Sequence, residues 1–150
     1  MFFMLMKDRK FLLLFLLLSL LLSACSSDDV DDQLTNTVWK CKGYASATDG
    51  TLNLIHPDQG SMSPSQYTIT FHTDGTVTGF SGANQFSGQY SVIGNRLTIY
   101  NVQQTLISFI GENIDYDDIL FHAIESYTIS SNELRLYFDN GQQFLLFSPV

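Results

Sequence analysis

The residues that could bind a metal or act in catalysis are few in this chain and lie far apart. The three histidines are His56, His72 and His122, and neither an H-E-x-x-H pattern nor a pair of neighbouring cysteines accompanies them. Asp118 and His122 stand four residues apart on a predicted helix, a spacing that favours a surface ion pair over a zinc site. We therefore predict no metal, no cofactor and no enzymatic activity.

Acidic residues gather just before and at the start of that predicted helix, at Glu112, Asp115, Asp117 and Asp118. The group lacks the glycine and the terminal glutamate of an EF-hand calcium loop. Negative charge is favoured at the start of a helix, where the helix dipole is positive. We interpret the acidic residues as stabilising the helix without a metal ion.

One cysteine has a context that indicates a specific modification. The basic residues Lys7, Arg9 and Lys10 precede an apolar run over 11–22, which is typical of a signal peptide and too short for a membrane-spanning helix. The run ends in the sequence L-S-A-C, which resembles a bacterial lipobox. The resemblance implies that residues 1–24 are removed and that Cys25 carries acyl chains such as palmitate. The alternative is an ordinary secretory signal followed by a chance cysteine.

The segment after this cysteine is acidic, with four aspartates within residues 28–32. Like charges repel one another and bury nothing, so we expect residues 25–33 to form an extended tether. The tether is either a simple spacer or, by resemblance, an export signal for the outer face of the outer membrane. The predicted location is therefore the outer membrane, lipid-anchored, facing the periplasm or exported to the cell surface.

The composition restricts the possible partners and cross-links of the mature chain. The full chain has 7 basic and 15 acidic residues, of which the signal peptide holds 3 and 1, so the mature chain has a net charge of −10. Such a charge excludes nucleic acid as a partner and leaves acyl chains on Cys25 as the contact with the membrane. Only Cys41 then remains, so an internal disulfide is impossible; its place beside Trp39 predicts a buried thiol.

Alternating apolar residues predict a mainly β fold. Strands are expected at 37–44, 66–72, 76–80, 89–93, 96–100, 126–129, 133–138 and 142–147, with one more short strand inside a long loop over 45–65. A helix is expected over 113–125, where Tyr116, Leu120, Ala123 and Ile124 form one apolar stripe. We predict a single domain over 34–150, a small antiparallel barrel or strongly curved sheet of about eight strands whose open end the helix covers.

The stretch 79–90 is the most distinctive part of the chain, with three glycines and Asn84 in twelve residues. Glycine allows positive φ or close approach of two backbones, and asparagine tolerates the left-handed region. We predict an irregular corner between two strands. Ser81 and Asn84 are interpreted as turn formers, not as catalytic groups, and Gly82 and Gly88 are candidates for positive φ.

The same stretch matches the pattern G-x-x-G-[CA]-N-x-x-x-G-x-Y and is similar to the META domain, the family of the heat-shock protein HslJ. The resemblance runs from Leu34 to Phe147 and implies structural roles for Trp39, Gly79, Gly82, Ala83, Asn84, Gly88 and Tyr90. Many family members have cysteine at the position of Ala83 and a second one where Ser108 and Phe109 stand here, so their thiol chemistry is absent. The resemblance implies a non-catalytic protein with a binding or envelope-stress role.

Two other functions stay open at this point. A small barrel can hold one apolar ligand, and aromatic residues are abundant, so a lipocalin-like carrier or sensor is possible, although the same rings could simply fill the core. The rings in question are those of Phe71, Phe80, Phe86, Phe138, Phe144 and Phe147. A protease inhibitor or assembly module is the third class, with the loop over 45–65 as its contact surface for an envelope protein.

Overall fold

The computed structural model describes residues 31–54, 67–107 and 116–150, which form nine strands and one short helical segment. The strands of the first half are β1 (Trp39–Ser46), β2 (Leu52–Leu54), β3 (Tyr67–Phe71), β4 (Thr76–Ser81), β5 (Asn84–Ile93) and β6 (Arg96–Gln104). After the helical segment come β7 (Ser126–Ser130), β8 (Glu133–Phe138) and β9 (Gln143–Pro149). Cys25 and the tether up to residue 30 lie outside the described residues. The expectation of an extended segment over 25–33 is wrong at its end, because residues 31–34 form a turn in which the Leu34 backbone N–H donates to the Asp31 carbonyl at 2.8 Å.

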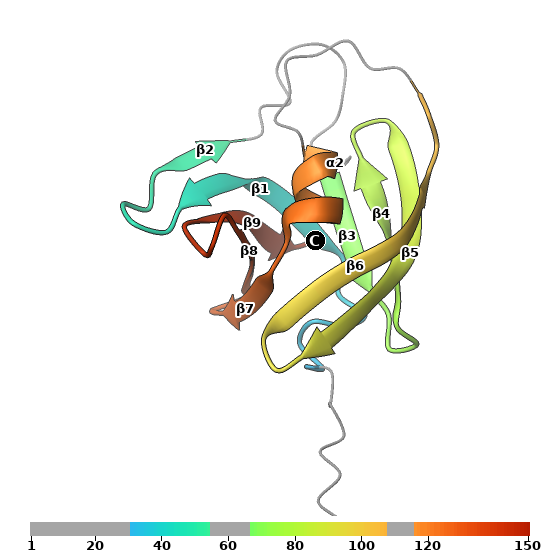
Figure 1. The fold of residues 1–150 in the computed structure, drawn as a ribbon, viewed down its shortest axis with the longest axis horizontal. Coiled ribbons are helices and arrows are strands. Elements are labelled where there is room, and N and C mark those ends of the chain that lie inside the picture. The colour runs from blue at the N-terminus through green and yellow to red at the C-terminus, as the bar shows by residue number, and fades with distance from the viewer. Residues whose placement is uncertain (1–30, 55–66, 108–115) are drawn as a thin grey trace, which may run out of the picture.

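Eight of the strands close into an antiparallel barrel, as predicted (Figure 1). Neighbours follow the chain from β3 to β9, and β1 completes the circle by pairing with β3 on one side and β9 on the other. The β1–β9 ladder is the longer of the two, from Trp39 opposite Pro149 to Ser46 opposite Gln143. The short strand expected within 45–65 is β2, which pairs with the outer half of β1 and takes no part in closure.

The barrel is weakest between β6 and β7. These two strands share only the pair Arg96–Ser126, flanked by two backbone hydrogen bonds, from Leu97 to Glu125 and from Tyr127 to Asn95. Beyond this point the strands diverge, and the helical segment lies beside β6 at the end of the barrel where the β4–β5 turn is found (Figure 1). The N-terminal residues 31–38 lie at the opposite end, near the β5–β6 turn.

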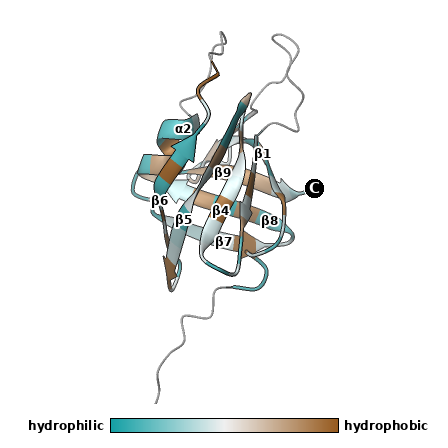
Figure 2. Ribbon diagram, turned by 90° about the vertical axis from the view of Figure 1, so that its right-hand side faces the viewer, coloured by the Kyte–Doolittle hydropathy of each residue, from teal (hydrophilic) through white to brown (hydrophobic). Residues whose placement is uncertain are grey.

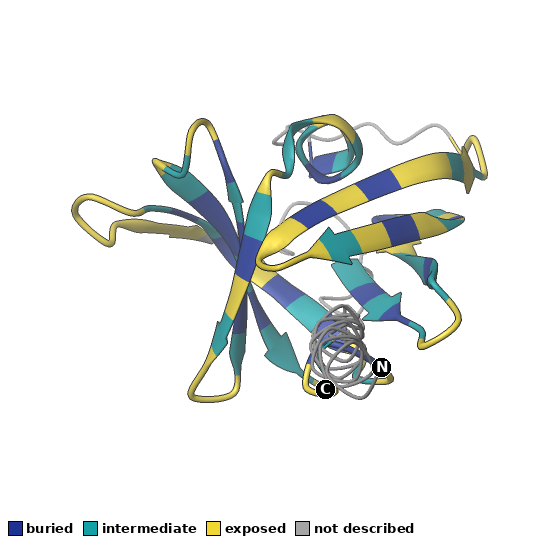
Figure 3. Ribbon diagram, turned by 60° about the horizontal axis from the view of Figure 1, so that its bottom comes forward, coloured by how far each residue is buried: buried dark blue, intermediate teal, exposed yellow. Residues whose placement is uncertain are grey.

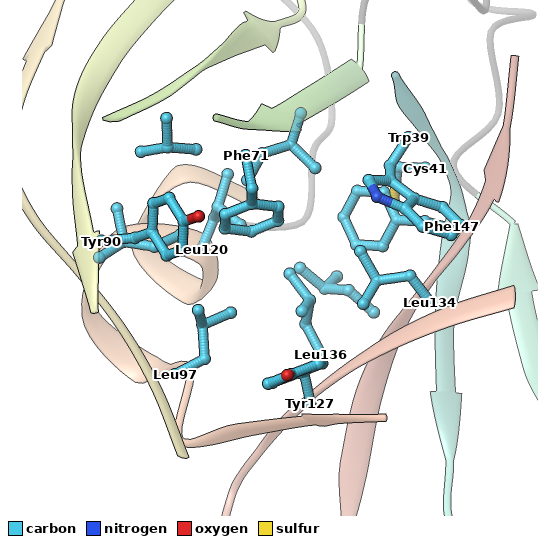
Figure 4. Close-up of a cluster of buried hydrophobic side chains, with 14 of the residues drawn as sticks. Trp39, Cys41, Phe71, Tyr90, Leu97, Leu120, Tyr127, Leu134, Leu136 and Phe147 are labelled. Atoms are coloured by element: carbon cyan, nitrogen blue, oxygen red, sulfur yellow. The ribbon is translucent and has the colours of Figure 1, made fainter. Parts of the chain in front are cut away.

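Alternate residues of the strands point inward and form one core, visible as the banding of β5 and β6 in Figure 3. Trp39 and Cys41 are buried on β1, and Leu97 and Ile99 on β6, as predicted. Leu34 precedes the barrel, yet it is fully buried and its carbonyl accepts a hydrogen bond from the Trp39 indole at 3.0 Å. Figure 4 shows side chains from all around the barrel meeting in this core.

Glycine and asparagine mark the turns correctly. Gly75 closes the β3–β4 hairpin at φ +82° and Gly94 the β5–β6 hairpin at φ +62°. Ser131 and Asn132 both take positive φ between β7 and β8, as does the run 139–141 between β8 and β9. These residue types tolerate the left-handed region at little cost, which is why the turns could be predicted.

The helix is shorter than predicted and changes its winding. A single turn, α2 (Tyr116–Asp118), continues directly as a π-helix, η3 (Ile119–Ala123), and Ile124 is already extended; residues 113–115 lie outside the described part. The apolar stripe is confirmed, since Tyr116 and Leu120 are buried in the core. The predicted ion pair between Asp118 and His122 is absent, because π-winding changes the four-residue spacing that would align the two side chains.

The prediction of an irregular corner within 79–90 is wrong. Gly82 and Ala83 form a two-residue turn, with Ser81 paired directly to Asn84 and Gly82 at φ +59°. β5 therefore begins at Asn84, five residues earlier than expected. Of the three glycines in the 79–90 stretch, only Gly82 has positive φ. The irregularity lies further along β5, in a bulge between Ser87 and Gln89 that contains Gly88.

Candidate functional site

Ser81 of the 79–90 stretch is hydrogen-bonded to the helical segment. The Ser81 hydroxyl donates a hydrogen bond to one carboxylate oxygen of Asp117, and the Gln104 amide donates to the other at 2.8 Å. This trio, which we call the Asp117 bridge, joins the ends of β4 and β6 to α2. No hydrogen bond joins Ser81 to either of the described histidines, His72 and His122, so the arrangement resembles a structural anchor and not an activated nucleophile. The interpretation of Ser81 as a turn former is therefore wrong.

Asn84 also acts across the barrel surface and not on its own turn. Its side-chain oxygen accepts hydrogen bonds from the Ile107 backbone at 2.7 Å and from the Thr105 hydroxyl at 3.3 Å. The Thr105 hydroxyl in turn accepts a bond from the Gln85 backbone at 3.0 Å. These contacts hold the segment after β6 against the start of β5, which gives Asn84 a structural role.

The glycines of the stretch serve close packing. A β-carbon at Gly79 would lie on the carbonyl oxygen of Thr68 and 2.6 Å from the Phe86 ring, so no larger residue fits there. At Gly88 it would lie 3.1 Å from the Tyr100 carbonyl oxygen, within the bulge. The prediction of positive φ at Gly88 is wrong, and its glycine is explained by this close approach.

The remaining predicted motif residues have structural contacts. Tyr90 is buried, its hydroxyl donates to the His72 carbonyl at 2.8 Å, and its ring meets Phe71 edge-on at 5.0 Å. Trp39 is 2% exposed. Ala83 is half-buried in the turn. The motif as a whole therefore fixes how β4, β5 and β6 meet.

The Cys41 thiol and the Tyr116 hydroxyl are buried and stay protonated at neutral pH. Burial raises the pKa of the Cys41 thiol to about 12, so it stays protonated and is a poor nucleophile. Burial likewise raises the pKa of Tyr116 well above its ordinary value of 10. Within the described part of the chain the Tyr116 hydroxyl has no hydrogen-bond partner, and its ring packs edge-on against Tyr67 at 5.1 Å.

Tyr116→Phe is expected to stabilise the domain by about 1 to 2 kcal/mol, because it removes a buried hydroxyl that has lost its water and gained no partner. The raised pKa means that the unfolded tyrosine ionises above pH 10 while the folded one stays protonated, so wild-type stability falls as pH rises through that range. The advantage of phenylalanine should therefore grow above pH 10. Urea unfolding at pH 7 and pH 10.5 measures both effects; a destabilised variant would show that the hydroxyl is bonded.

The histidines and acidic residues considered as metal ligands do not form a site in the described part of the chain. Among residues 31–54, 67–107 and 116–150, no group of three histidine, cysteine, aspartate or glutamate side chains could hold a metal ion. The His72 ring bonds to the Thr78 hydroxyl at 2.9 Å, and His122 is exposed. His56, Glu112 and Asp115 lie outside the described residues.

The aromatic residues mostly fill the core. Of the six phenylalanines considered for a ligand cavity, Phe80 is 43% exposed on the outside of β4 and the other five are buried. The prediction of Phe80 as an inward-facing ring is therefore wrong.

Of the loop considered for partner contacts, β2 is described and residues 55–65 are not. The described part of the chain contains no helix with the length and apolarity needed to cross a membrane.

Comparisons with known proteins agree with this architecture. A protein of Tannerella forsythia named "Putative lipoprotein" is 26% identical over 126 residues, covering 79% of this chain and 77% of its own. The solution structure of a Burkholderia xenovorans protein superposes with a TM-score of 0.58 at 24% identity, over 78% of this chain and 83% of that one. A DUF4847-family protein from Bacteroides vulgatus gives 0.52 at 16% identity, over 77% and 93%. These two structures share the fold. The META domain family itself matches residues 32–149, and the chain therefore belongs to that family.

Proposed function

We propose that this protein is a cell-envelope lipoprotein, anchored to a membrane by acyl chains on Cys25, whose META domain acts by binding and not by catalysis. The observation that carries the proposal is the lipobox sequence L-S-A-C at residues 22–25, which eight residues separate from the buried Leu34. The lipoprotein name of the Tannerella forsythia relative supports it. A role in envelope stress tolerance is part of the proposal.

The spacing between anchor and domain suits a protein that stands close to a bilayer without entering it. Because residues 31–34 form a turn, the reach of the tether comes from residues 26–30, which can span at most roughly 18 Å when fully extended. Their aspartates would keep the segment hydrated and away from anionic headgroups. Two or three acyl chains bind a membrane far more firmly than one, because each buried methylene contributes about 0.8 kcal/mol.

We assign the anchor to the outer membrane. Ser26 beside the acylated cysteine, followed by an acidic run, supports export over retention in the inner membrane. Separation of inner and outer membranes on a sucrose gradient tests this assignment, and protease treatment of intact cells distinguishes the cell surface from the periplasmic face.

The non-catalytic part of the proposal is supported by how the reactive groups are used. The Ser81 hydroxyl is bonded to Asp117, Asn84 is bonded to the segment at residues 105–107, and the Cys41 thiol is buried with a pKa of about 12. These three groups are thus either bonded within the fold or buried in its core.

Cys25→Ser is expected to abolish labelling of the protein by radioactive palmitate and to shift it from the membrane pellet to the soluble fraction. Both results follow because the serine hydroxyl cannot take the place of the thiol in acylation. Cys41→Ala is the matched control: its thiol is buried and unreactive, so this variant should keep the label and the membrane location. Retained label or unchanged sedimentation of Cys25→Ser would contradict the proposal.

A further inference from the structure

The outer surface of the four neighbouring strands β3 to β6 consists largely of uncharged side chains, which is unusual for so acidic a chain. The outward residues of β3 and β4 are Thr68, Thr70, Thr76, Thr78 and Phe80. Those of β5 and β6, from the Gln85 row to the row before Ile93, are Gln85, Ser87, Gln89, Ser91, Thr98, Tyr100, Asn101 and Gln103. The Asn101 amide donates a hydrogen bond to the Gln89 side-chain oxygen at 2.7 Å. None of these side chains is charged, although the whole chain has a net charge of −8. We call this surface the neutral face.

The strand register places these side chains side by side. Thr68, Phe80 and Gln85 are consecutive cross-strand partners, and Thr70, Thr78, Ser87 and Gln103 form the next row. Charged and titratable groups border the face. Lys40 on β1 pairs with Thr68, and Arg96 lies at the turn end. The Asp74 carboxylate accepts a hydrogen bond from the Thr76 hydroxyl at 2.6 Å, and the His72 ring bonds to the Thr78 hydroxyl at 2.9 Å. Figure 2 views the barrel from the side of β4 and β5, whose ribbons show few strongly apolar positions.

Two aromatic rings stand out from this hydroxyl-rich and amide-rich surface. Phe80 is 43% exposed and Tyr100 is 42% exposed, although both belong to residue types that usually bury most of their area. Phe80 pairs with Gln85 and Tyr100 pairs with Gln89, four residues further along β5. Strand geometry therefore separates the rings by roughly 15 Å, with hydroxyl and amide groups between them.

We propose that the neutral face binds an uncharged oligosaccharide. A sugar chain presents hydroxyl groups that both donate and accept hydrogen bonds, which threonine, serine and glutamine side chains can match. It also presents apolar C–H faces, which pack against exposed aromatic rings. A charged polymer would find no opposite charge on this surface. A protein partner would be expected to meet an apolar centre with arginine or several aromatic anchors, and the face between the two rings holds neither.

This inference names the ligand class for the binding role proposed above and so rests on that role, but it does not depend on the lipid anchor. Failure of sugar binding in a protein that is acylated on Cys25 would contradict the ligand class alone. Failure of acylation with sugar binding intact would contradict the anchor alone.

The test is isothermal titration calorimetry of the full-length purified protein in a detergent without a sugar headgroup. The probes are four neutral hexasaccharides, namely maltohexaose, cellohexaose, mannohexaose and chitohexaose, and the charged hexamer of polygalacturonate. We expect saturable binding of at least one neutral probe and none of the charged one. Phe80→Ala and Tyr100→Ala should each weaken that binding at least tenfold. Leu106→Ala is the control, because Leu106 is 94% exposed and lies outside the neutral face.

Both rings lie on the outer surface, so we expect both variants to stay folded at the temperature of the titration. A cooperative thermal transition above that temperature checks this and separates lost binding from lost structure. Three outcomes would overturn the inference: no heat with any neutral hexasaccharide at millimolar concentration, equal affinity in the Phe80→Ala Tyr100→Ala double variant, or tighter binding of the charged probe. A change from oligomer to monomer in the double variant would instead assign the face to contact between copies of the chain, and would also overturn it.

Discussion

Gly79→Ala is expected to destabilise the domain by about 3 kcal/mol, at the upper end of what overpacking of a core costs. The new β-carbon would lie on the Thr68 carbonyl oxygen of β3 and 2.6 Å from the Phe86 ring of β5. A backbone atom cannot rotate away, so β3 and β4 must separate and the Phe86 ring must leave its buried position. Denaturant unfolding followed by the fluorescence of Trp39, the one tryptophan in the chain, measures the loss.

Gly94→Ala is the matched control for this prediction. Gly94 has φ +62° and no heavy atom within 4 Å of its would-be β-carbon, so alanine there costs only the left-handed strain, about 1 kcal/mol. Equal losses in the two variants would show that Gly79 is not held by close packing and that backbone entropy alone explains both.

Asp117→Ala is expected to cost about 2 kcal/mol, because it removes a carboxylate that accepts two hydrogen bonds and leaves the buried Ser81 and the half-buried Gln104 without their partner. These bonds tie the helical segment to the barrel at the end where β6 and β7 have separated. We therefore expect faster amide hydrogen exchange in 116–123 as well as lower stability. Hydrogen exchange read by mass spectrometry gives the local effect, and urea unfolding gives the global one.

Asp118→Ala provides the comparison for Asp117. Asp118 is adjacent in sequence and exposed, and no hydrogen bond or ion pair to its side chain is found among the described residues, so its loss should change stability by less than about 0.5 kcal/mol. If both substitutions had the same effect, the acidic residues would act through helix electrostatics, as the sequence first suggested, and the Asp117 bridge would not matter.

Most of the fold could be predicted from sequence because strands and turns leave local patterns. The alternation of Trp39 with Cys41 and of Leu97 with Ile99 gives the inward face directly, and Gly75 and Gly94 mark turns that need positive φ. The same alternation, counted from the buried Val77, would have turned Phe80 outward. Phenylalanine usually lies in a core, so at position 80 the residue type and the alternation of the strand predict opposite orientations.

The site could not be predicted in the same way, because its contacts join residues far apart in the chain. Ser81 and Asp117 are separated by 36 positions, and Asn84 and Ile107 by 23, so each looked like a local turn or helix residue. The change to π-winding at Ile119 had no sequence signal either, since the apolar stripe of Tyr116 and Leu120 fits an α-helix equally well.

The most direct measurement of the central claim is the mass of the N-terminal peptide of the protein purified from its own membranes. The account predicts that this peptide begins at Cys25, that residues 1–24 are absent, and that the mass is raised by a diacylglyceryl group, with a further acyl chain on the amino group. A peptide that begins elsewhere, or one that begins at Cys25 without added mass, would contradict the proposal that this META-family protein is a lipoprotein.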